Sequence, residues 1–255
     1  MAMDSDTLAQ LIATIRRFVD DRLIPAEAEV AETDTIPADI VADMRDLGLF
    51  GLTAPEEFGG LGLTMEEEVL AIFELGRAAP AFRSMFATNV GIGMQGIAID
   101  GTPEQKAKYL PGLASGEIIG SFALTEPDVG SDAGSVKTTA RRDGDHYILN
   151  GTKRFITNAP HAGLFTVMAR TDPAQKGASG VSAFAGEDDG RVHAEAGNVD
   201  TKGKRLMAID KDLAGHGFIY SGSGEELHQS FTWKFAKHTD ADKIRIEAVS
   251  INPAL

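Results

Sequence analysis

The spacing of the apolar residues changes at Gly116, and this change limits the folds that the chain can adopt. Before this point the apolar residues recur every three or four positions, as on one face of an α-helix. After it, short β-branched and aromatic runs alternate with Gly, Asp and Asn, as strands alternate with turns. We therefore predict an α+β fold with an all-α helical domain at residues 1–115, a β-barrel-like domain at 116–184 and a β-leaning segment at 185–255.

Capping signals mark several helix ends in the first domain. The first helix should stop before Pro25, because the residue before a proline disfavours helical backbone. Pro37 and Gly48 stand where a first-turn proline and a C-terminal cap would bound a second helix. Thr64 and Thr102 each begin a capping-box pattern. These signals predict a bundle-like or orthogonal array of helices.

Composition excludes several classes of function. Lys and Arg number 24 against 38 Asp and Glu, a net charge of −14 that argues against nucleic acid and anionic lipid as partners. The chain has no cysteine, and its six histidines lack ligand spacing, so we expect no metal site. The sequence shows no signal peptide and no apolar stretch long enough to span a bilayer. It predicts a soluble cytoplasmic protein without membrane insertion.

The first candidate site is the string at residues 121–132, where a short apolar strand runs into Thr125, Glu126 and Pro127 and then into a polar loop. Gly130 lets backbone approach a ligand closely. Thr125 and Ser131 offer hydroxyl groups. This arrangement suits a planar heterocycle held by hydrogen bonds to its rim. An ordinary strand followed by an Asx-rich turn is an equal alternative.

The second candidate site follows the Asn150-Gly151 pair. Asn-Gly is the strongest short-range signal for a β-hairpin, because both turn residues tolerate positive φ, so we predict a hairpin over residues 146–157. Phe155 and Thr157 would then share one face of the return strand. An aromatic ring and a hydroxyl on one face could cover a flavin and bond to its edge. The alternative is a barrel strand with Phe155 in the core.

Together the two strings resemble the acyl-CoA dehydrogenase family, and the resemblance extends over about residues 5–184. The motifs that carry it are, in chain order, Leu49-Phe50-Gly51-Leu52, Pro55-Glu56-Glu57-Phe58-Gly59-Gly60, Glu104-Gln105-Lys106, Leu124-Thr125-Glu126-Pro127, Gly130-Ser131-Asp132, Asn150-Gly151-Thr152-Lys153 and Phe155-Ile156-Thr157-Asn158. Members have a helical domain, a β-barrel-like domain and a second helical domain, and they hold FAD noncovalently. The pattern cannot be followed after about Phe184, so the sequence predicts that the C-terminal helical domain of the family is absent.

The resemblance also implies a site and a reaction. Its FAD-binding positions correspond to Phe122, Leu124, Thr125, Gly130, Ser131, Phe155 and Thr157. Ser131 would also contact the acyl-CoA substrate, and Phe155 stands where many members have tryptophan. Family members remove the α-proton of an acyl-CoA thioester with a carboxylate while the β-hydrogen leaves as hydride to the flavin. The electrons then pass to an electron-transferring flavoprotein.

The catalytic base stays unassigned. In the family it is a glutamate of the C-terminal helical domain, which also builds a tetramer. Glu126 belongs to the loop motif and should have a local structural role, while Glu225, Glu226 and Glu247 should be surface charge. Two alternatives to the dehydrogenase are open: a truncated or fused protein that binds ligand or partner without catalysis, and a flavin oxidase or monooxygenase of the same fold. If the chain is complete, we expect a homo-oligomer.

Overall fold

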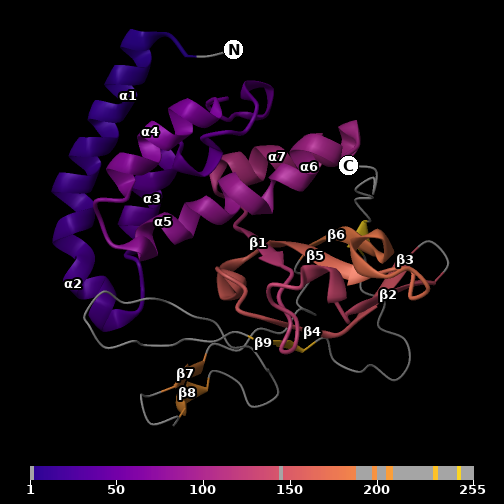
Figure 1. Cartoon of the computed structure of the whole chain (residues 1–255). Helices are drawn as coiled ribbons and strands as arrows, with labels where there is room; N and C mark the ends of the chain where they lie inside the picture. The colour runs from indigo at the N-terminus through magenta and orange to yellow at the C-terminus, as the bar shows by residue number, and fades with distance from the viewer. Residues whose placement is uncertain are drawn as a thin grey trace.

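The computed structural model describes residues 3–143 and 146–187, together with four short strand segments beyond them. Helices occupy the chain as far as Ser115, and strands follow from Gly120 (Figure 1). This order confirms the predicted α+β fold, with helices first and a β-sheet after them. Most of the segment predicted as β-leaning, 185–255, lies outside the described residues.

The helical part is built from seven α-helices in the described chain. They are α1 (Ser5–Phe18), α2 (Ile24–Thr33), α3 (Ala38–Asp46), α4 (Met65–Leu75), α5 (Pro80–Ala87), α6 (Gln95–Asp100) and α7 (Pro103–Ser115). Two π-helical turns, η1 (Val19–Leu23) and η4 (Thr88–Gly93), continue α1 into α2 and α5 towards α6. Across the residues that the structure describes, no helix combines the length and the apolar character needed to cross a membrane.

The capping signals are confirmed at three helix ends. Gly48 follows α3 with a φ of 70°, a left-handed conformation that glycine adopts without steric cost. Thr64 and Thr102 form complete capping boxes at the starts of α4 and α7, with Glu67 and Gln105 as the reciprocal partners. Short local signals of this kind fix helix starts because they satisfy backbone N–H groups that have no partner within the helix.

The prediction that the first helix stops before Pro25 is wrong. The N–H of Ile24 donates to the carbonyl of Val19, five residues earlier, so the hydrogen-bond ladder is offset in the π-helical turn η1. Pro25 then stands in the first turn of α2, where a missing N–H costs nothing. The chain therefore stays helical from Ser5 to Thr33.

The core of the helical part forms around large aromatic side chains. Phe50 and Phe86 are fully buried and meet edge to face, with ring centroids 6.4 Å apart and an interplanar angle of 77°. Ala71 and Leu75 of helix α4 pack in this core. Its opposite side stays open to solvent, and the ring of Phe73 there is 72% exposed.

The strands form one larger sheet and two strand pairs. The larger sheet has the order β10 (Ile246–Glu247), β6 (Val181–Glu187), β5 (Leu164–Arg170), β2 (Thr139–Asp143) and β3 (His146–Asn150), with β1 (Gly120–Ala123) also on β5. The pairs are β4 (Thr152–Arg154) with β9 (Thr232–Lys234), and β7 (Gly197–Val199) with β8 (Arg205–Ala208). Helices α6 and α7 lie beside the larger sheet (Figure 1), and their apolar residues share a core with Leu164 and Ala185.

Strand β5 lies in the middle of the larger sheet, and strands β1 and β2 both pair with the same edge of it. Strand β1 pairs with the first half of β5 in parallel, and β2 meets the same strand at Arg170 through Thr139. The chain therefore leaves this edge after Ala123 and returns to it at Thr139. The intervening residues 124–138, called the 124–138 loop below, contain most of the first candidate site.

The predicted hairpin around Asn150-Gly151 is wrong. Strand β3 pairs with β2 and β4 pairs with β9, so the two strands that flank this turn do not pair with each other. Neither residue has positive φ. Gly151 is needed for a different reason, because a Cβ there would lie 2.3 Å from Oγ1 and 2.7 Å from Cα of Thr138. The chain passes from one sheet to another here, pressed against the end of the 124–138 loop.

Candidate functional site

The two candidate strings lie side by side and run in opposite directions. Near one end, the hydroxyl of Ser121 donates to the carbonyl of Thr157 over 2.7 Å. Near the other, the backbone N–H of Arg154 donates to the carbonyl of Thr125, also over 2.7 Å. The structure therefore brings together the two segments that the sequence marked separately, although they come from different sheets.

All seven predicted ligand-binding residues are accessible, at least in part. Phe122, Leu124 and Thr125 are half-buried, and Gly130, Ser131, Phe155 and Thr157 are exposed. Several of their neighbours in the two strings are buried, namely Ser121, Ala123, Glu126 and Ile156. Within the described residues, no cluster of His, Asp and Glu side chains could hold a metal ion. The accessible set consists of apolar surface and hydroxyl groups, which suits an organic ligand with a polar rim.

Phe155 has a backbone conformation that is rare for a bulky residue. Its φ is 60°, in the left-handed region. Strand β4 ends at Arg154, so the prediction that Phe155 and Thr157 lie on one continuous strand is wrong. The alternative of a core phenylalanine is wrong too, because the side chain is 39% exposed. The Arg154 guanidinium lies 4.6 Å from the ring centroid and supports it. Strained residues of this kind often occur at ligand sites.

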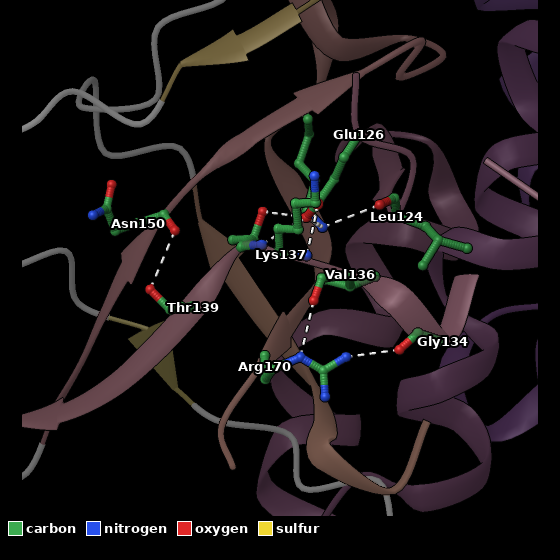
Figure 2. A network of polar contacts seen from close by, with 10 residues as sticks. Leu124, Glu126, Gly134, Val136, Lys137, Thr139, Asn150 and Arg170 are labelled. Carbon is green, nitrogen blue, oxygen red and sulfur yellow. Dashed lines mark hydrogen bonds and ion pairs between the residues drawn. The ribbon is translucent and has the colours of Figure 1, made fainter. Parts of the chain in front are cut away.

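A buried ion pair joins the two strings beneath the accessible surface. The ammonium of Lys153 lies 2.9 Å from Oε1 of Glu126, and the two residues are 0% and 5% exposed. The same ammonium donates to the carbonyl of Leu124 over 3.0 Å. In Figure 2 a dashed line marks the hydrogen bond that the Leu124 carbonyl accepts, close to Glu126. The Lys153 side chain, in the second string, thus binds both Leu124 and Glu126 of the first string.

The carboxylate of Glu126 also holds the returning end of the 124–138 loop. Its Oε2 accepts from the backbone N–H of Lys137 over 2.7 Å, and its Oε1 accepts from the N–H of Thr138 over 2.8 Å and from the Thr138 hydroxyl. The predicted local structural role of Glu126 is confirmed by these bonds. A carboxylate with this many donors is poorly suited to abstract a proton from a substrate.

The surroundings lower the pKa values of both Glu126 and Lys153. Burial alone would raise the pKa of Glu126, but hydrogen bonds from Thr138, Lys153 and the backbone outweigh it and hold that pKa below the usual 4.5. Burial lowers the pKa of Lys153, and the pairing with Glu126 opposes this shift only in part. The lowered pKa of Glu126 keeps its carboxyl group ionised near neutral pH.

Acid should remove the contribution of Glu126 to stability. Because its pKa is lower in the folded chain, the contribution is complete above about pH 4.5 and is lost as the pH falls through the folded-state value. We expect the difference in unfolding free energy between the wild type and Glu126→Gln to shrink as the pH is lowered from neutral through this range. Urea titrations of both proteins at a series of pH values measure it. A difference that stays constant down to the acid unfolding of the wild type would contradict the assignment.

Arg170 fastens the far side of the loop, a role that the sequence analysis did not anticipate. Its guanidinium donates to the carbonyls of Gly134 and Val136 at 2.7 and 3.0 Å, within the 124–138 loop (Figure 2). It also donates to the carbonyls of Gln175 and Gly177, in the connection from β5 to β6. In the sequence, the signal for this role is that Arg170 ends the otherwise apolar strand at Leu164–Arg170.

Asn158 connects the site to the helical part and was also missed. Its φ is 61°, and its side-chain amide donates to the carbonyls of Ser84 and Met85 at 2.9 and 3.0 Å. Both carbonyls belong to α5. The segment that carries Phe155 and Thr157 is thereby fixed to a helix as well as to the 124–138 loop.

Two glycines of the site should respond differently to alanine. Gly151→Ala places a methyl group against the side chain and the Cα of Thr138, so we expect a loss of about 1–3 kcal/mol of unfolding free energy. Gly130→Ala meets nothing within 4 Å and should change stability by less than about 0.5 kcal/mol. Chemical denaturation measures both. Equal losses for the two variants would show that the close approach at Gly151 does not constrain the chain.

Comparison with known families identifies both halves of this architecture. Residues 5–117 match the model of the acyl-CoA dehydrogenase N-terminal domain, and residues 121–209 match that of the acyl-CoA dehydrogenase middle domain. The boundary between the two matches falls where α7 gives way to β1. The two candidate strings both lie within the middle-domain match.

Individual relatives agree with the family models. An acyl-CoA dehydrogenase of Bacillus subtilis is 41% identical over 170 residues, which is 67% of this chain and 45% of the relative. A short-chain-specific acyl-CoA dehydrogenase of Clostridium acetobutylicum is 38% identical over the same shares of both chains. The chain thus spans about half the length of the curated relatives that it matches.

A solved structure gives the same result for the fold. The acyl-CoA dehydrogenase of Bacillus anthracis, solved in complex with FAD, superimposes with a TM-score of 0.71 at 28% identity, and the match covers 96% of this chain and 37% of that one. The two domain models in sequence order, the relatives and the shared fold lead to one conclusion. This chain belongs to the acyl-CoA dehydrogenase family.

Proposed function

We propose that this chain binds FAD and serves in the α,β-dehydrogenation of an acyl-CoA thioester. The observation that carries the proposal is the pairing of two accessible strings over one buried polar network, in a chain that belongs to the acyl-CoA dehydrogenase family. Family membership supplies the reaction class. The side-by-side strings supply apolar surface and hydroxyl groups of the kinds that a flavin could use.

The residues proposed to hold FAD are seven of the accessible positions in the two strings. The ring of Phe155 and the side chains of Phe122 and Leu124 provide apolar surface for a planar ring system. The hydroxyls of Thr125 and Thr157 provide donors and acceptors for its polar edge. At Gly130 a Cβ would meet no atom within 4 Å, so the backbone there leaves room for a cofactor.

In this proposal Ser131, exposed in the 124–138 loop, contacts the acyl-CoA as well as the cofactor. FAD, when bound, accepts the β-hydrogen of the substrate as hydride. The protein must also polarise the thioester carbonyl, since the α-proton is otherwise too weakly acidic. We assign no residue as the base, because Glu126 is committed to the loop. The proposed partners are an electron-transferring flavoprotein and further copies of the chain.

The experiment is an absorption spectrum of the purified chain before and after addition of FAD, followed by anaerobic titration with a panel of acyl-CoA thioesters. We expect visible flavin absorbance that saturates with FAD and bleaches with at least one thioester. A chain that carries no flavin and gains none would overturn the proposal. Flavin that binds but never bleaches would support a binding protein without catalysis.

Matched threonine variants make the test specific. Thr157→Val removes a proposed flavin contact, whereas Thr139→Val removes an exposed threonine hydroxyl on β2 that the proposal does not use. We expect Thr157→Val to weaken FAD binding by about tenfold, the equivalent of one hydrogen bond, and Thr139→Val to bind as the wild type does. Oxygen consumption by the reduced protein would distinguish an oxidase from a dehydrogenase.

A further inference from the structure

We propose that the Glu126–Lys153 pair is a positioning element that sets Thr125 and Thr157 in register for the cofactor. This inference rests on the proposed function and deepens it, because it assigns a role to two buried residues that would touch neither FAD nor substrate. The pair is the deepest polar contact between the two strings, with both partners at most 5% exposed.

The first step of the argument is the geometry of the contact. Consecutive residues of β4, Lys153 and Arg154, hold Leu124, Thr125 and Glu126 of the other string through three bonds. Two of these bonds go to backbone carbonyls, so they fix the main chain itself. A shift of β4 along its axis would break all three together.

The second step is the position of the pair between accessible groups. Thr125 precedes Glu126 directly, and Phe155 and Thr157 follow Lys153 by two and four residues. Ile156 is buried between the last two and anchors that end. The separation of the two threonine hydroxyls therefore depends on how the Lys153 ammonium is seated against the first string.

The third step is that the pair closes the loop that carries Gly130 and Ser131. Glu126 stands near the start of the 124–138 loop and accepts from the N–H groups of Lys137 and Thr138 at its end. Lys153 thus reaches both ends of the loop through a single carboxylate. The second string and the loop should move as one unit.

The fourth step concerns energy. A buried ion pair gives little or no net stability over apolar side chains of similar volume, because desolvation of both charges offsets their attraction. Its directional bonds nevertheless specify one arrangement of the groups that it joins. The contribution of the pair should therefore appear in the geometry of the site more than in the stability of the fold.

The test compares Glu126→Gln/Lys153→Met, in which no buried charge is left alone, with Glu67→Gln as the matched control. Glu67 is also a buried carboxylate with backbone N–H partners, those of Met3 and Thr64, but it lies in the helical part. In the full-length chain we expect the double variant to bind FAD about tenfold or more weakly and to shift the visible band of the bound flavin. Glu67→Gln should bind FAD with wild-type affinity and spectrum.

Hydrogen exchange of the chain without FAD tests the coupling independently of the proposed function. In the double variant we expect amides of residues 126–138 and 153–158 to exchange faster together, while those of α4 keep their wild-type rates. Thr138→Val, which removes one donor to Glu126 and leaves the pair intact, should give a smaller change in the same amides. A wild type without FAD binding would overturn the proposed function alone.

The inference itself fails if the folded double variant shows wild-type exchange at both segments, or if it binds FAD with wild-type affinity and spectrum. If the double variant does not fold, Glu126→Gln alone, which removes the charge of one partner, decides the question. Faster exchange confined to residues 126–138 and 153–158 supports the inference. Unchanged exchange in both segments overturns it.

Discussion

Lys153→Met is expected to lower the free energy of unfolding by about 3–5 kcal/mol, the largest effect of any single change at the site. The variant leaves the Glu126 carboxylate buried without its counter-charge, and water cannot reach it because the residue is only 5% exposed. The Leu124 carbonyl loses a donor as well. Chemical denaturation near neutral pH measures the loss.

A surface pair with the same separation provides the control. The ammonium of Lys137 lies 2.9 Å from the carboxylate of Asp128, the same distance as in the Lys153–Glu126 pair, but its two side chains are 66% and 72% exposed. Lys137→Met should therefore cost less than about 1 kcal/mol. Adding Glu126→Gln to Lys153→Met should recover much of the lost stability. Similar losses for the buried and exposed lysines would show that burial does not govern these pairs.

Phe50→Ala should cost about 3–5 kcal/mol, because it leaves a cavity beneath the last helix of the helical part. The ring is fully buried, meets Phe86 edge to face and lies so close to Gly116 that a Cβ there would be 2.6 Å from it. Gly116 is the cap of α7, just before β1 begins. Denaturation of Phe50→Ala measures the loss. Phe73→Ala, at a side chain that is 72% exposed, is the control and should stay within about 0.5 kcal/mol.

Features decided by neighbouring residues were readable from the sequence. The capping boxes at Thr64 and Thr102 and the left-handed cap at Gly48 were predicted correctly, because each depends on residues within one or two turns. The helical stop before Pro25 was not, because a π-helical turn offset the ladder just before it. A proline is tolerated where the ladder is already interrupted, and apolar periodicity does not reveal that interruption.

The Asn150-Gly151 pair shows where local reasoning fails. Its composition is that of a tight hairpin turn, yet the flanking strands pair elsewhere, and the glycine is required by Thr138, thirteen positions earlier. Such a contact is created by the tertiary fold and leaves no local signal. The roles of Lys153 and Arg170 escaped for the same reason, since their partners lie in a loop that only the fold brings near. The structure does bring the two candidate strings together, while the cofactor contacts assigned to their residues stay a prediction.

The double attachment of the chain to one edge of β5 has a consequence for how this site can vary. The 124–138 loop runs from β1 to β2, and both of these strands pair with the same edge of β5. Residues could be added between the two attachment points at a small entropic cost, about 0.6 kcal/mol for each doubling of loop length. Ligand preference could therefore be altered by lengthening the exposed part of this loop while Glu126, Lys137 and Thr138 are kept.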